Sequence, residues 1–432
     1  MLQFFDYLKH QSHTYPVNSP MALTAVLELD SVAPSPVARQ HSILVGVTRH
    51  ETCLVLRGRL RALRKAGFDV TVVSSPGVLL TRTAALEGVR SAGISIRRGI
   101  APLADLISFL RLWLLIGRLR PDIVEFSTPK AGLLGTLAAW LRRVPRRVYM
   151  LRGLKLESTS GFKRRLLLGA ERLAARCAHV VLCNSRSLRA QAMALGVAPP
   201  SRLHLLGEGS SNGVEIDHFS PGRSMVRIRL RLRRHAKVVG FVGRLTRDKG
   251  VPELLKAFDQ ILEREPEAYL LLVGWFDNGE DELPPALRER IKAHPQIHCT
   301  GYVPDPLPYY RAMDVMVLPT WREGFPNVVL EAAATGIPVV TTLSTGSRDS
   351  VVPEVTGLLI PPGIPEAISE AVCKLLADPE RAQRMGAAAR AWVLEHYVDE
   401  HVMHLTSSFY QSLLASPPVH ELLNEPAQSY PE

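Results

Sequence analysis

Cysteine is scarce in this chain of 432 residues, and the spacing of the few cysteines excludes several classes of protein. There are five, an odd number, and no two form a C-x-x-C pair; they are Cys53, Cys177, Cys183, Cys299 and Cys373. Disulfide scaffolds and cysteine zinc sites need cysteines in pairs or at short spacings. We therefore expect reduced core thiols in a cytoplasmic protein.

Long hydrophobic runs are missing too. The most apolar stretch, Leu103–Leu119, is interrupted by Asp105, Arg111 and Arg118. A charge near the centre of a membrane-spanning helix is costly, so this stretch predicts a helix of a folded domain. Two interpretations of its arginines stay open: they are solvated, or they contact lipid headgroups.

Charge is divided unevenly along the chain. Residues 1–215 contain 30 Lys+Arg against 13 Asp+Glu, a balance of +17, whereas residues 216–432 contain 22 against 28, a balance of −6. A basic surface attracts nucleic acid, an anionic membrane or a phosphate-bearing acceptor. Because the basic residues are scattered over several predicted helices without a nucleic-acid-binding motif, we expect no nucleic acid as partner.

Short apolar runs alternate with helical periodicities through most of the chain. Ile43–Val47, Asp69–Val73 and Ile94–Arg97 are predicted as strands, and Thr52–Ala66 as a helix between the first two. The alternation resumes at Val238–Val242. Strand, helix, strand units of this kind form parallel sheets with right-handed crossovers, so we predict an α/β fold.

The stretch Arg322–Thr342 (REGFPNVVLEAAATGIPVVTT) has the features of a phosphate site. Pro326 is predicted as the first helical residue and Gly336 as the end of the helix. The free N–H groups of Phe325, Asn327 and Val328 would then point out of a helix start, where they and the helix dipole attract phosphate. Such a helix also occurs in α/β domains without this function, so the stretch alone leaves both interpretations open.

Two glutamates on either side of this turn extend the prediction to a sugar. Glu331, one turn into the helix, is placed to reach a pair of sugar hydroxyls near the phosphate. Glu323, on the preceding loop, is placed to contact a second sugar. Together they predict a nucleotide-sugar site.

A second element lies about 80 residues earlier, where the strand Val238–Val242 leads into Gly243, Arg244 and Lys249. Glycine at the carboxyl end of a strand lets backbone approach a ligand, and ligands of open α/β sheets bind at those ends. Two cations on one loop would neutralise a diphosphate leaving group. The alternative is a solvated basic turn.

Taken together, the two stretches resemble the family 4 retaining glycosyltransferases of the GT-B fold. The resemblance rests on FVGRLTRDKGV and on REGFPNVVLEAAATGIPVV, whose glutamates are separated by seven residues, and it extends over about residues 42–397. Within the family the chain is similar to bacterial enzymes of capsule, O-antigen and exopolysaccharide assembly. The resemblance implies an α/β GT-B fold with two Rossmann-like domains facing each other across a cleft.

The resemblance also implies roles for individual residues. Arg244 and Lys249, beside Gly243, would bind the donor diphosphate, Glu331 the ribose hydroxyls, and Glu323 the transferred sugar. Backbone around Phe325 to Val328 would complete the phosphate site, so that stabilisation of the leaving group is electrostatic. We expect Arg244, Lys249 and Glu323 to be the catalytic residues.

Four further residues are predicted to contact substrates. By resemblance, the backbone at Gly301 and Tyr302 meets the nucleotide base. Lys130, on a loop leading into a helix, is a candidate for the acceptor phosphate, with a solvated lysine as the alternative. Arg152 stands where many relatives have a histidine near the reacting sugar; because arginine stays protonated, it cannot act as a base, and we expect it to bind an anionic group of acceptor or donor.

The two predicted Rossmann-like domains and the crossing helix follow the same resemblance, whereas the extension and the tail are predicted because the first 40 residues lack clear periodicity and the end of the chain contains prolines. In chain order, the predicted segments are a flexible extension at residues 1–40 with Met21 as an alternative initiator, an N-terminal Rossmann-like acceptor domain at 41–215, a C-terminal Rossmann-like nucleotide-sugar domain at 216–396, a helix crossing back to the first domain at 397–416, and a disordered tail at 417–432.

The predicted function is retaining transfer of a hexose or N-acetylhexosamine from a nucleotide sugar to a lipid-linked or glycan acceptor in cell-surface polysaccharide biosynthesis. A UDP-linked donor is expected only because the resembled family commonly uses UDP. The sequence contains no D-x-D, so we expect neither a metal nor a cofactor. The expected location is cytoplasmic and peripheral, at the inner face of the cell membrane through the basic half. The alternatives are a GT-B epimerase or phosphorylase, and a catalytically silent nucleotide-sugar-binding subunit of a polysaccharide assembly complex.

Overall fold

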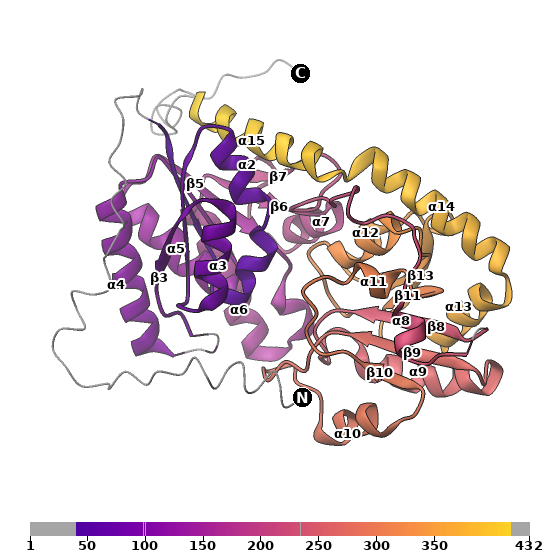
Figure 1. Ribbon diagram of the computed structural model, residues 1–432. Coiled ribbons are helices and arrows are strands. Elements are labelled where there is room, and N and C mark those ends of the chain that lie inside the picture. Colours follow the sequence, from indigo (N-terminus) through magenta and orange to yellow (C-terminus); the bar gives the residue numbers. More distant parts are fainter. Residues whose placement is uncertain (1–39, 98, 100, 234, 416–432) are drawn as a thin grey trace, which may run out of the picture. The chain divides into compact units, whose positions relative to one another are not determined.

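A computed structural model describes residues 40–97, 99, 101–233 and 235–415, which form two parallel β-sheets with helices on their faces (Figure 1). The named strands all pair in parallel, as the predicted α/β fold requires. Both sheets belong to one compact unit of the chain. The predicted tail, and the predicted extension except Gln40, lie outside the described residues.

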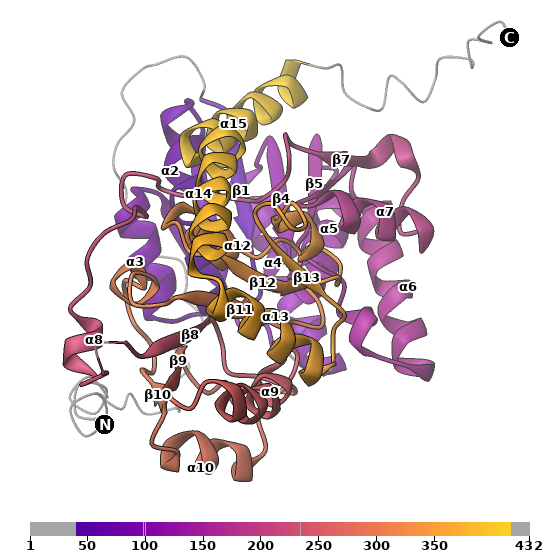
Figure 2. The ribbon, with the colours of Figure 1, turned by 90° about the vertical axis from the view of Figure 1, so that its right-hand side faces the viewer.

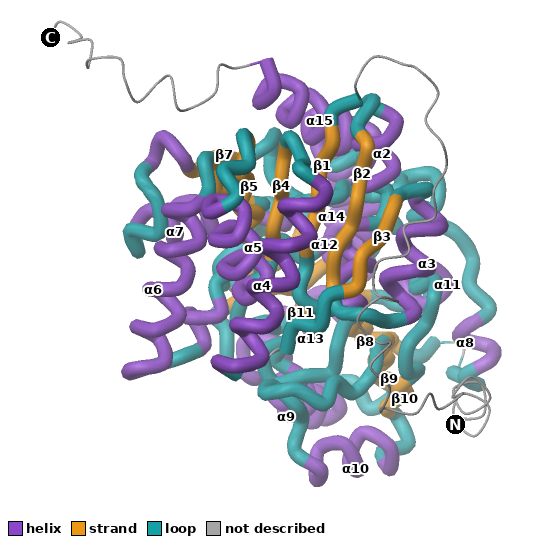
Figure 3. Tube along the Cα trace, turned by 90° about the vertical axis from the view of Figure 1, so that its left-hand side faces the viewer, coloured by secondary structure: helices purple, strands orange, loops and turns teal. Residues whose placement is uncertain are grey.

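The first sheet has seven strands in the order β3-β2-β1-β4-β5-β6-β7. The strands are β1 (Ser42–Gly46), β2 (Asp69–Ser74), β3 (Arg90–Gly93), β4 (Ile123–Ser127), β5 (Arg146–Leu151), β6 (Val180–Cys183) and β7 (Leu203–Leu205). The helices between them are η3 (His50–Leu56), α2 (Arg59–Lys65), α3 (Val78–Glu87), α4 (Pro102–Leu119), α5 (Pro129–Leu141), η4 (Lys155–Ser158), α6 (Gly161–Cys177), α7 (Arg186–Ala194) and η5 (Pro200–Arg202). Figure 3 shows α4, α5 and α6 as neighbours beside these strands.

The second sheet has six strands in the order β10-β9-β8-β11-β12-β13. The strands are β8 (Lys237–Val242), β9 (Ala268–Val273), β10 (Ile297–Cys299), β11 (Val315–Leu318), β12 (Val339–Thr342) and β13 (Gly357–Ile360). The helices are α8 (Val226–Arg229), α9 (Val251–Arg264), α10 (Pro285–Ala293), α11 (Leu307–Tyr310), α12 (Asn327–Ala334), η6 (Arg348–Ser350), α13 (Pro365–Ala377) and α14 (Pro379–His396). Helix α14 packs against α12, as Figure 2 shows.

Both faces of the first sheet are buried, which explains why its strands are almost continuously apolar. Alternate side chains of β1 pack into the hydrophobic cores on opposite faces of the sheet. Ile43 and Val45 pack with α2 and α3 residues, whereas Leu44 packs with α4 and α5 residues. A separate core lies around the second sheet, where Phe241 and Phe258 are fully buried.

Two predicted elements differ from the structure. The predicted helix Thr52–Ala66 is two helices, η3 and α2, because Gly58 between them has a φ of 74° and interrupts the helical backbone. The predicted strand Ile94–Arg97 lies next to the real one, β3, which ends at Gly93. Ile94 and Ile96 are apolar because they are buried in the core after the strand has ended.

The last helix, α15 (Asp399–Ala415), packs against α2 of the first sheet (Figure 1). The Tyr410 hydroxyl donates a hydrogen bond to the Glu125 carboxylate and accepts one of 3.1 Å from Arg59. Arg59 donates a second hydrogen bond of 2.5 Å to Glu125. All three residues are almost completely buried, so the helix supplies part of a polar network inside the first half of the protein.

Each sheet has one point where the strand order reverses. Strand β1 lies between β2 and β4, and β8 lies between β9 and β11. Ligands of open parallel sheets bind outside the carboxyl ends of the strands at such a point. The loops after β1 and β4, and those after β8 and β11, are therefore the places where the fold favours a site.

In the part of the chain that the structure describes, no helix is both long and apolar enough to cross a membrane.

The Tyr410 network gives a prediction about stability. Tyr410→Phe removes one hydrogen bond from the buried Glu125 carboxylate, so we expect the protein to lose about 1–3 kcal/mol and to melt at a lower temperature. The control is Tyr397→Phe, because within the described part of the chain the Tyr397 hydroxyl makes only a 3.4 Å hydrogen bond, to the Glu208 carbonyl. Equal melting temperatures for Tyr410→Phe and the wild type would contradict the importance of the network.

Candidate active site

The loops after β8 and β11 meet at the reversal point of the second sheet. Because β8 and β11 are parallel neighbours, their carboxyl ends lie at the same edge. The loop after β8 contains Arg244 and Lys249, and the loop after β11 contains Glu323. The fold thus brings together two stretches that are about 80 residues apart in the sequence.

Lys249 and Glu323 form an ion pair that joins these two loops. Their side chains are 18% and 14% exposed, so solvent screens the pair only in part. The Glu323 backbone N–H donates to the Thr345 carbonyl, which fixes the loop against the segment after β12. An ammonium and a carboxylate held side by side offer a ligand one donor for phosphate and one acceptor for a hydroxyl.

Arg244 forms an ion pair with Asp277, a residue that the sequence analysis did not single out. The loop itself is held by Asp248, which accepts hydrogen bonds of 2.6 Å from Thr246 and 2.9 Å from Arg322. Burial alone would raise the pKa of Asp248, but the hydrogen bond from Thr246 and the charges of Lys249, Arg322 and Arg244 lower it. Asp248 therefore stays ionised, and its hydrogen bonds with Thr246 and Arg322 join the loop after β8 to the loop after β11.

Helix α12 begins one residue later than predicted. Pro326 is its N-cap, with φ −83° and ψ 97°, and Asn327 is the first helical residue. The prediction placed Pro326 inside the helix because proline is common at the first helical position. The backbone N–H groups of Phe325, Asn327 and Val328 have no hydrogen-bond acceptor among the described residues. They are the free donors that the sequence predicts for an anion.

Glu331 lies one turn into α12 and accepts a 2.8 Å hydrogen bond from the hydroxyl of Tyr310. Burial raises the pKa of Glu331 to about 7, although the Tyr310 hydrogen bond and the charge of His218 oppose the shift. Burial also raises the pKa of Tyr310 well above its usual value, so the phenol remains a donor. Without a ligand, the Glu331 carboxyl is therefore partly protonated at neutral pH.

Glycines bring three backbone segments together at the ends of β8, β9 and β10. A Cβ on Gly274 would lie 1.8 Å from the Gly243 carbonyl oxygen, so only glycine permits this approach. Gly274 also forms a β-bridge with Gly301. Next to it, the Tyr302 ring packs edge-on against Trp275 with centroids 5.5 Å apart. The predicted residues Gly243, Gly301 and Tyr302 therefore lie at one edge of the sheet.

The turn after Glu323 packs against the first half of the protein. A Cβ on Gly324 would lie 2.5 Å from the Arg152 carbonyl oxygen, and one on Gly346 would lie 2.3 Å from the Gly324 carbonyl oxygen. Gly346 in turn donates a 2.7 Å hydrogen bond to the Ser187 hydroxyl. These contacts place Arg152, which follows β5, beside the Glu323 loop.

Lys130 is not brought to this group of residues. Its ammonium donates to both carboxylate oxygens of Asp105 at 2.7 and 2.9 Å, and it also donates to the Gly99 carbonyl. It lies at the start of α5, near the point where Thr48 and Thr128 share a 2.6 Å hydrogen bond after β1 and β4. The predicted acceptor contact at Lys130 remains a prediction.

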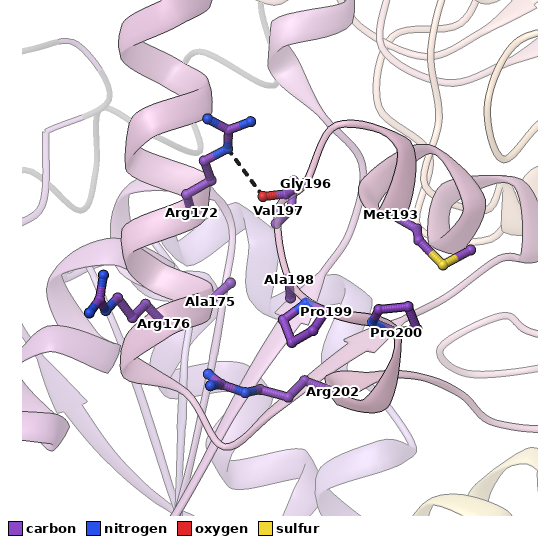
Figure 4. A pocket seen from close by; sticks show the side chains of 10 residues that line it. All are labelled: Arg172, Ala175, Arg176, Met193, Gly196, Val197, Ala198, Pro199, Pro200 and Arg202. Carbon is purple, nitrogen blue, oxygen red and sulfur yellow. Dashed lines mark hydrogen bonds between the residues drawn. The ribbon is translucent and has the colours of Figure 1, made fainter. Parts of the chain in front are cut away.

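A hollow of about 590 Å³ lies elsewhere, between α6 and the segment after α7 (Figure 4). It is lined by Arg172, Ala175, Arg176, Met193, Gly196, Val197, Ala198, Pro199, Pro200 and Arg202. Arg172 donates to the Leu195 and Gly196 carbonyls and so closes the loop onto α6. None of the predicted site residues lines this hollow, and we assign it no part in the reaction.

The described residues contain no group of three or more His, Cys, Asp or Glu side chains placed to hold a metal ion.

Several functional candidates were not predicted from the sequence, namely Asp248, Asp277, Tyr310 and Arg322. The only signal for Asp248 was its position between Arg244 and Lys249, and Asp277 and Tyr310 follow no motif that connects them to the site.

Two family models match most of the two sheets. The first half matches a "Glycosyl transferase 4-like domain" over residues 54–209, and the second matches "Glycosyl transferases group 1" over residues 236–378. The second match contains both loops of the candidate site.

Two similar proteins are glycosyltransferases, in agreement with these family models. The capsular polysaccharide biosynthesis glycosyltransferase CapM of Staphylococcus aureus is 34% identical over 369 residues, which are 85% of this chain and 96% of CapM. The UDP-Gal:alpha-D-GlcNAc-diphosphoundecaprenol alpha-1,3-galactosyltransferase of Escherichia coli is 28% identical over 271 residues, 61% of this chain and 68% of that enzyme.

A solved structure supports the fold. Anabaena Alr3699/HepE, solved with UDP and glucose, superposes with a TM-score of 0.72 at 20% identity, covering 87% of this chain and 99% of its own. On the family models and the match to CapM, this chain belongs to the family 4 glycosyltransferases of the GT-B fold, of the type that builds bacterial capsule and related polysaccharides.

Proposed function

We propose that this glycosyltransferase transfers a hexose or N-acetylhexosamine, with retention of anomeric configuration, from a UDP-linked donor to a lipid-linked or glycan acceptor. The observation that carries the proposal is the Lys249–Glu323 ion pair beside the free N–H groups at the start of α12. That arrangement combines donors for a diphosphate with an acceptor for a sugar hydroxyl.

In this proposal most of the predicted residues have a chemical task. Arg244 and Lys249 bind the diphosphate, together with the backbone N–H groups of Phe325, Asn327 and Val328. Glu323 accepts a hydrogen bond from the transferred sugar, and Glu331 accepts hydrogen bonds from the ribose hydroxyls. The edge formed by Gly301 and Tyr302 receives the base. These contacts form a fixed electrostatic site, which stabilises charge as it develops on the leaving group.

The reaction breaks the bond between the anomeric carbon and the phosphate oxygen and forms a bond from the same face to the acceptor oxygen. The proton of the acceptor hydroxyl passes to the leaving phosphate, so the products are the new glycoside and the nucleoside diphosphate. The cations beside the diphosphate take the place that a metal ion has in other enzymes, and we propose that none is required. The UDP of the donor and the lipid-linked acceptor are supported by the names of similar proteins.

The acceptor would reach the enzyme at the inner membrane surface. Five apolar residues on α4 lie on one face at helical spacing and are 46–80% exposed: Leu103, Leu106, Ile107, Leu110 and Leu114. Helix α6, which like α4 packs against α5, exposes Phe162 at 79% and carries Lys163, Arg164 and Arg165 at its start. Apolar side chains beside cations bind anionic lipid surfaces, so we propose that these two helices contact the membrane.

Lys249→Ala tests the diphosphate site. Removal of one cation should lower turnover of the preferred donor about 100-fold or more, because charge on the leaving group is then less stabilised. The measurement is release of nucleoside diphosphate from a panel of UDP- and GDP-sugars with membrane extract as acceptor, with and without EDTA.

The matched control is Lys256→Ala, because Lys256 is an exposed lysine on α9 outside the site. Turnover by the wild type that EDTA abolishes would contradict metal independence. If the wild type binds a donor but never consumes it, a silent nucleotide-sugar-binding subunit becomes the better description.

Glu331→Gln tests the ribose contact through pH. Below pH 7 much of the Glu331 carboxyl is protonated, and a diol that needs its carboxylate must displace that proton. We expect UDP binding at pH 6 to release close to one proton more from the wild type than from the variant, because the protons lost by the terminal phosphate of UDP are common to both. Calorimetry in buffers of different ionisation enthalpy measures this number.

The matched control is Glu171→Gln. Burial raises the pKa of Glu171 to about 7 as well, but its hydrogen-bond partner is Tyr149 of the first half. Both carboxyls bind a proton more tightly in the folded than in the unfolded chain, so each makes stability fall as pH rises from about 4.5 to about 7. Both variants should reduce that slope, whereas only Glu331→Gln should change proton release on UDP binding.

A triple variant tests the membrane surface. Leu103→Gln, Leu106→Gln and Leu110→Gln together should lower binding to phosphatidylglycerol vesicles roughly tenfold or more, because apolar area is lost from the contact. Sedimentation with vesicles measures binding. Val78→Gln with Leu86→Gln on α3 is the control, since these side chains are 73% and 54% exposed but α3 packs on the opposite face of the sheet from α4. Equal loss in both variants would refute the assignment.

A further inference from the structure

A buried cluster in the first half contains two arginines and one glutamate. Arg59 and Glu125 are 1% and 0% exposed and form an ion pair that Tyr410 completes. Arg152 lies close to them. Burial would raise the pKa of Glu125, but the charges of Arg59 and then Arg152 hold it below its usual value. The cluster therefore contains two positive charges and one negative charge.

Arg59 and Tyr410 both donate to Oε2 of the single carboxylate, and its Oε1 is buried without a hydrogen-bond partner among the described residues. One carboxylate faces two guanidinium groups and Arg59 is hydrogen-bonded to it, so Arg152 is left with little compensation. Its Nη1 donates a 2.8 Å hydrogen bond to the Ser211 hydroxyl. Its Nε and Nη2 atoms are buried and have no hydrogen-bond partner among the described residues. Burial and repulsion from Arg59 lower the pKa of Arg152 to about 10, which still leaves it charged at neutral pH.

The two unpartnered nitrogens form one edge of the guanidinium group. Nε–H and Nη2–H are parallel donors on that edge, and this fork matches the two oxygens of a carboxylate or phosphate. A buried cationic fork without an acceptor is unfavourable unless a ligand supplies one.

Arg152 also lies beside the donor loops. Its carbonyl oxygen contacts Gly324, the residue after Glu323. Ser211, which its side chain binds, follows Ser210, and the Ser210 hydroxyl donates a 3.1 Å hydrogen bond to Asn327 at the start of α12. Both the backbone and the side chain of Arg152 thus contact or adjoin the segments that the proposed function assigns to the transferred sugar and the diphosphate.

We propose that Arg152 binds an oxyanion which the substrates carry in addition to the nucleotide diphosphate. The two possible sources are a carboxylate on the transferred sugar, as in a hexuronic acid, and a phosphate of the lipid-linked acceptor. This inference rests on the proposed function, because it places the oxyanion beside the donor loops. In this proposal the second positive charge of the cluster selects substrates that carry this oxyanion.

The first arm of the test uses donors in matched pairs that differ only by oxidation at the sixth carbon: UDP-glucose with UDP-glucuronate, and GDP-mannose with GDP-mannuronate. Affinities are measured by calorimetry for the wild type, Arg152→Gln and Arg152→Lys, with UDP and GDP alone as reference. If the sugar is the source, Arg152→Gln weakens binding of the acidic member tenfold or more and leaves the neutral member and the nucleotide unchanged.

The second arm uses farnesyl diphosphate and the uncharged farnesol as acceptor probes. If the acceptor is the source, the same selective loss occurs for farnesyl diphosphate and not for farnesol. Arg152→Lys keeps the charge but lacks the fork, so it should lose less than Arg152→Gln, and it provides the comparison if the glutamine variant does not fold. Arg172→Gln is the control, because Arg172 binds only backbone carbonyls at the surface.

A selective loss of the charged ligand in either arm supports the inference. Equal losses for charged and neutral ligands, or no loss in either arm, would overturn it, since Arg152 would then act on the diphosphate or on the fold alone. If the wild type binds no nucleotide at all, the proposed function fails as well, whereas nucleotide binding without any selective loss removes only the role of Arg152.

Discussion

The ion pair between Lys249 and Glu323 is the interaction on which the candidate site depends. It joins two loops that leave neighbouring parallel strands, and it exists because the strand order of the second sheet reverses between them. Asp248 and Arg322 hold the same loops from behind with a 2.9 Å hydrogen bond. The cations and the helix start are therefore placed before any substrate arrives, which lowers the reorganisation needed during the reaction.

The motifs predicted much of this arrangement because each lies directly after a strand. A glycine, an arginine and a lysine after Val238–Val242, and a helix with Pro326 as its N-cap after β11, define both chemistry and position. The GT-B fold followed from the resemblance that these motifs carry, and the family models and structural comparison agree with it.

The remaining features depend on distant contacts that periodicity does not encode. The helix break at Gly58 and the end of β3 at Gly93 were not predicted, because buried apolar residues occur on both sides of each boundary. Hydrophobic periodicity therefore gave no sign of where the element ends. Tyr310 meets Glu331, and Arg244 meets Asp277, through the folding of the second sheet. Arg152 was predicted as a site residue because many relatives have a histidine at its position. Its charged neighbours Arg59 and Glu125 could not be predicted, because they are distant in the sequence.

Helix α15 brings residues from the end of the chain into the core of the first sheet, and this affects the order in which the protein becomes complete during translation. The last strand of that sheet ends at Leu205, yet Tyr410 closes the network of Arg59 and Glu125. About 200 residues must therefore leave the ribosome after the sheet has been synthesised and before this buried pair is covered. A nascent chain that stops before α15 would leave Arg59 and Glu125 without the Tyr410 hydroxyl that covers them, so the first domain is complete only when the whole chain has been made.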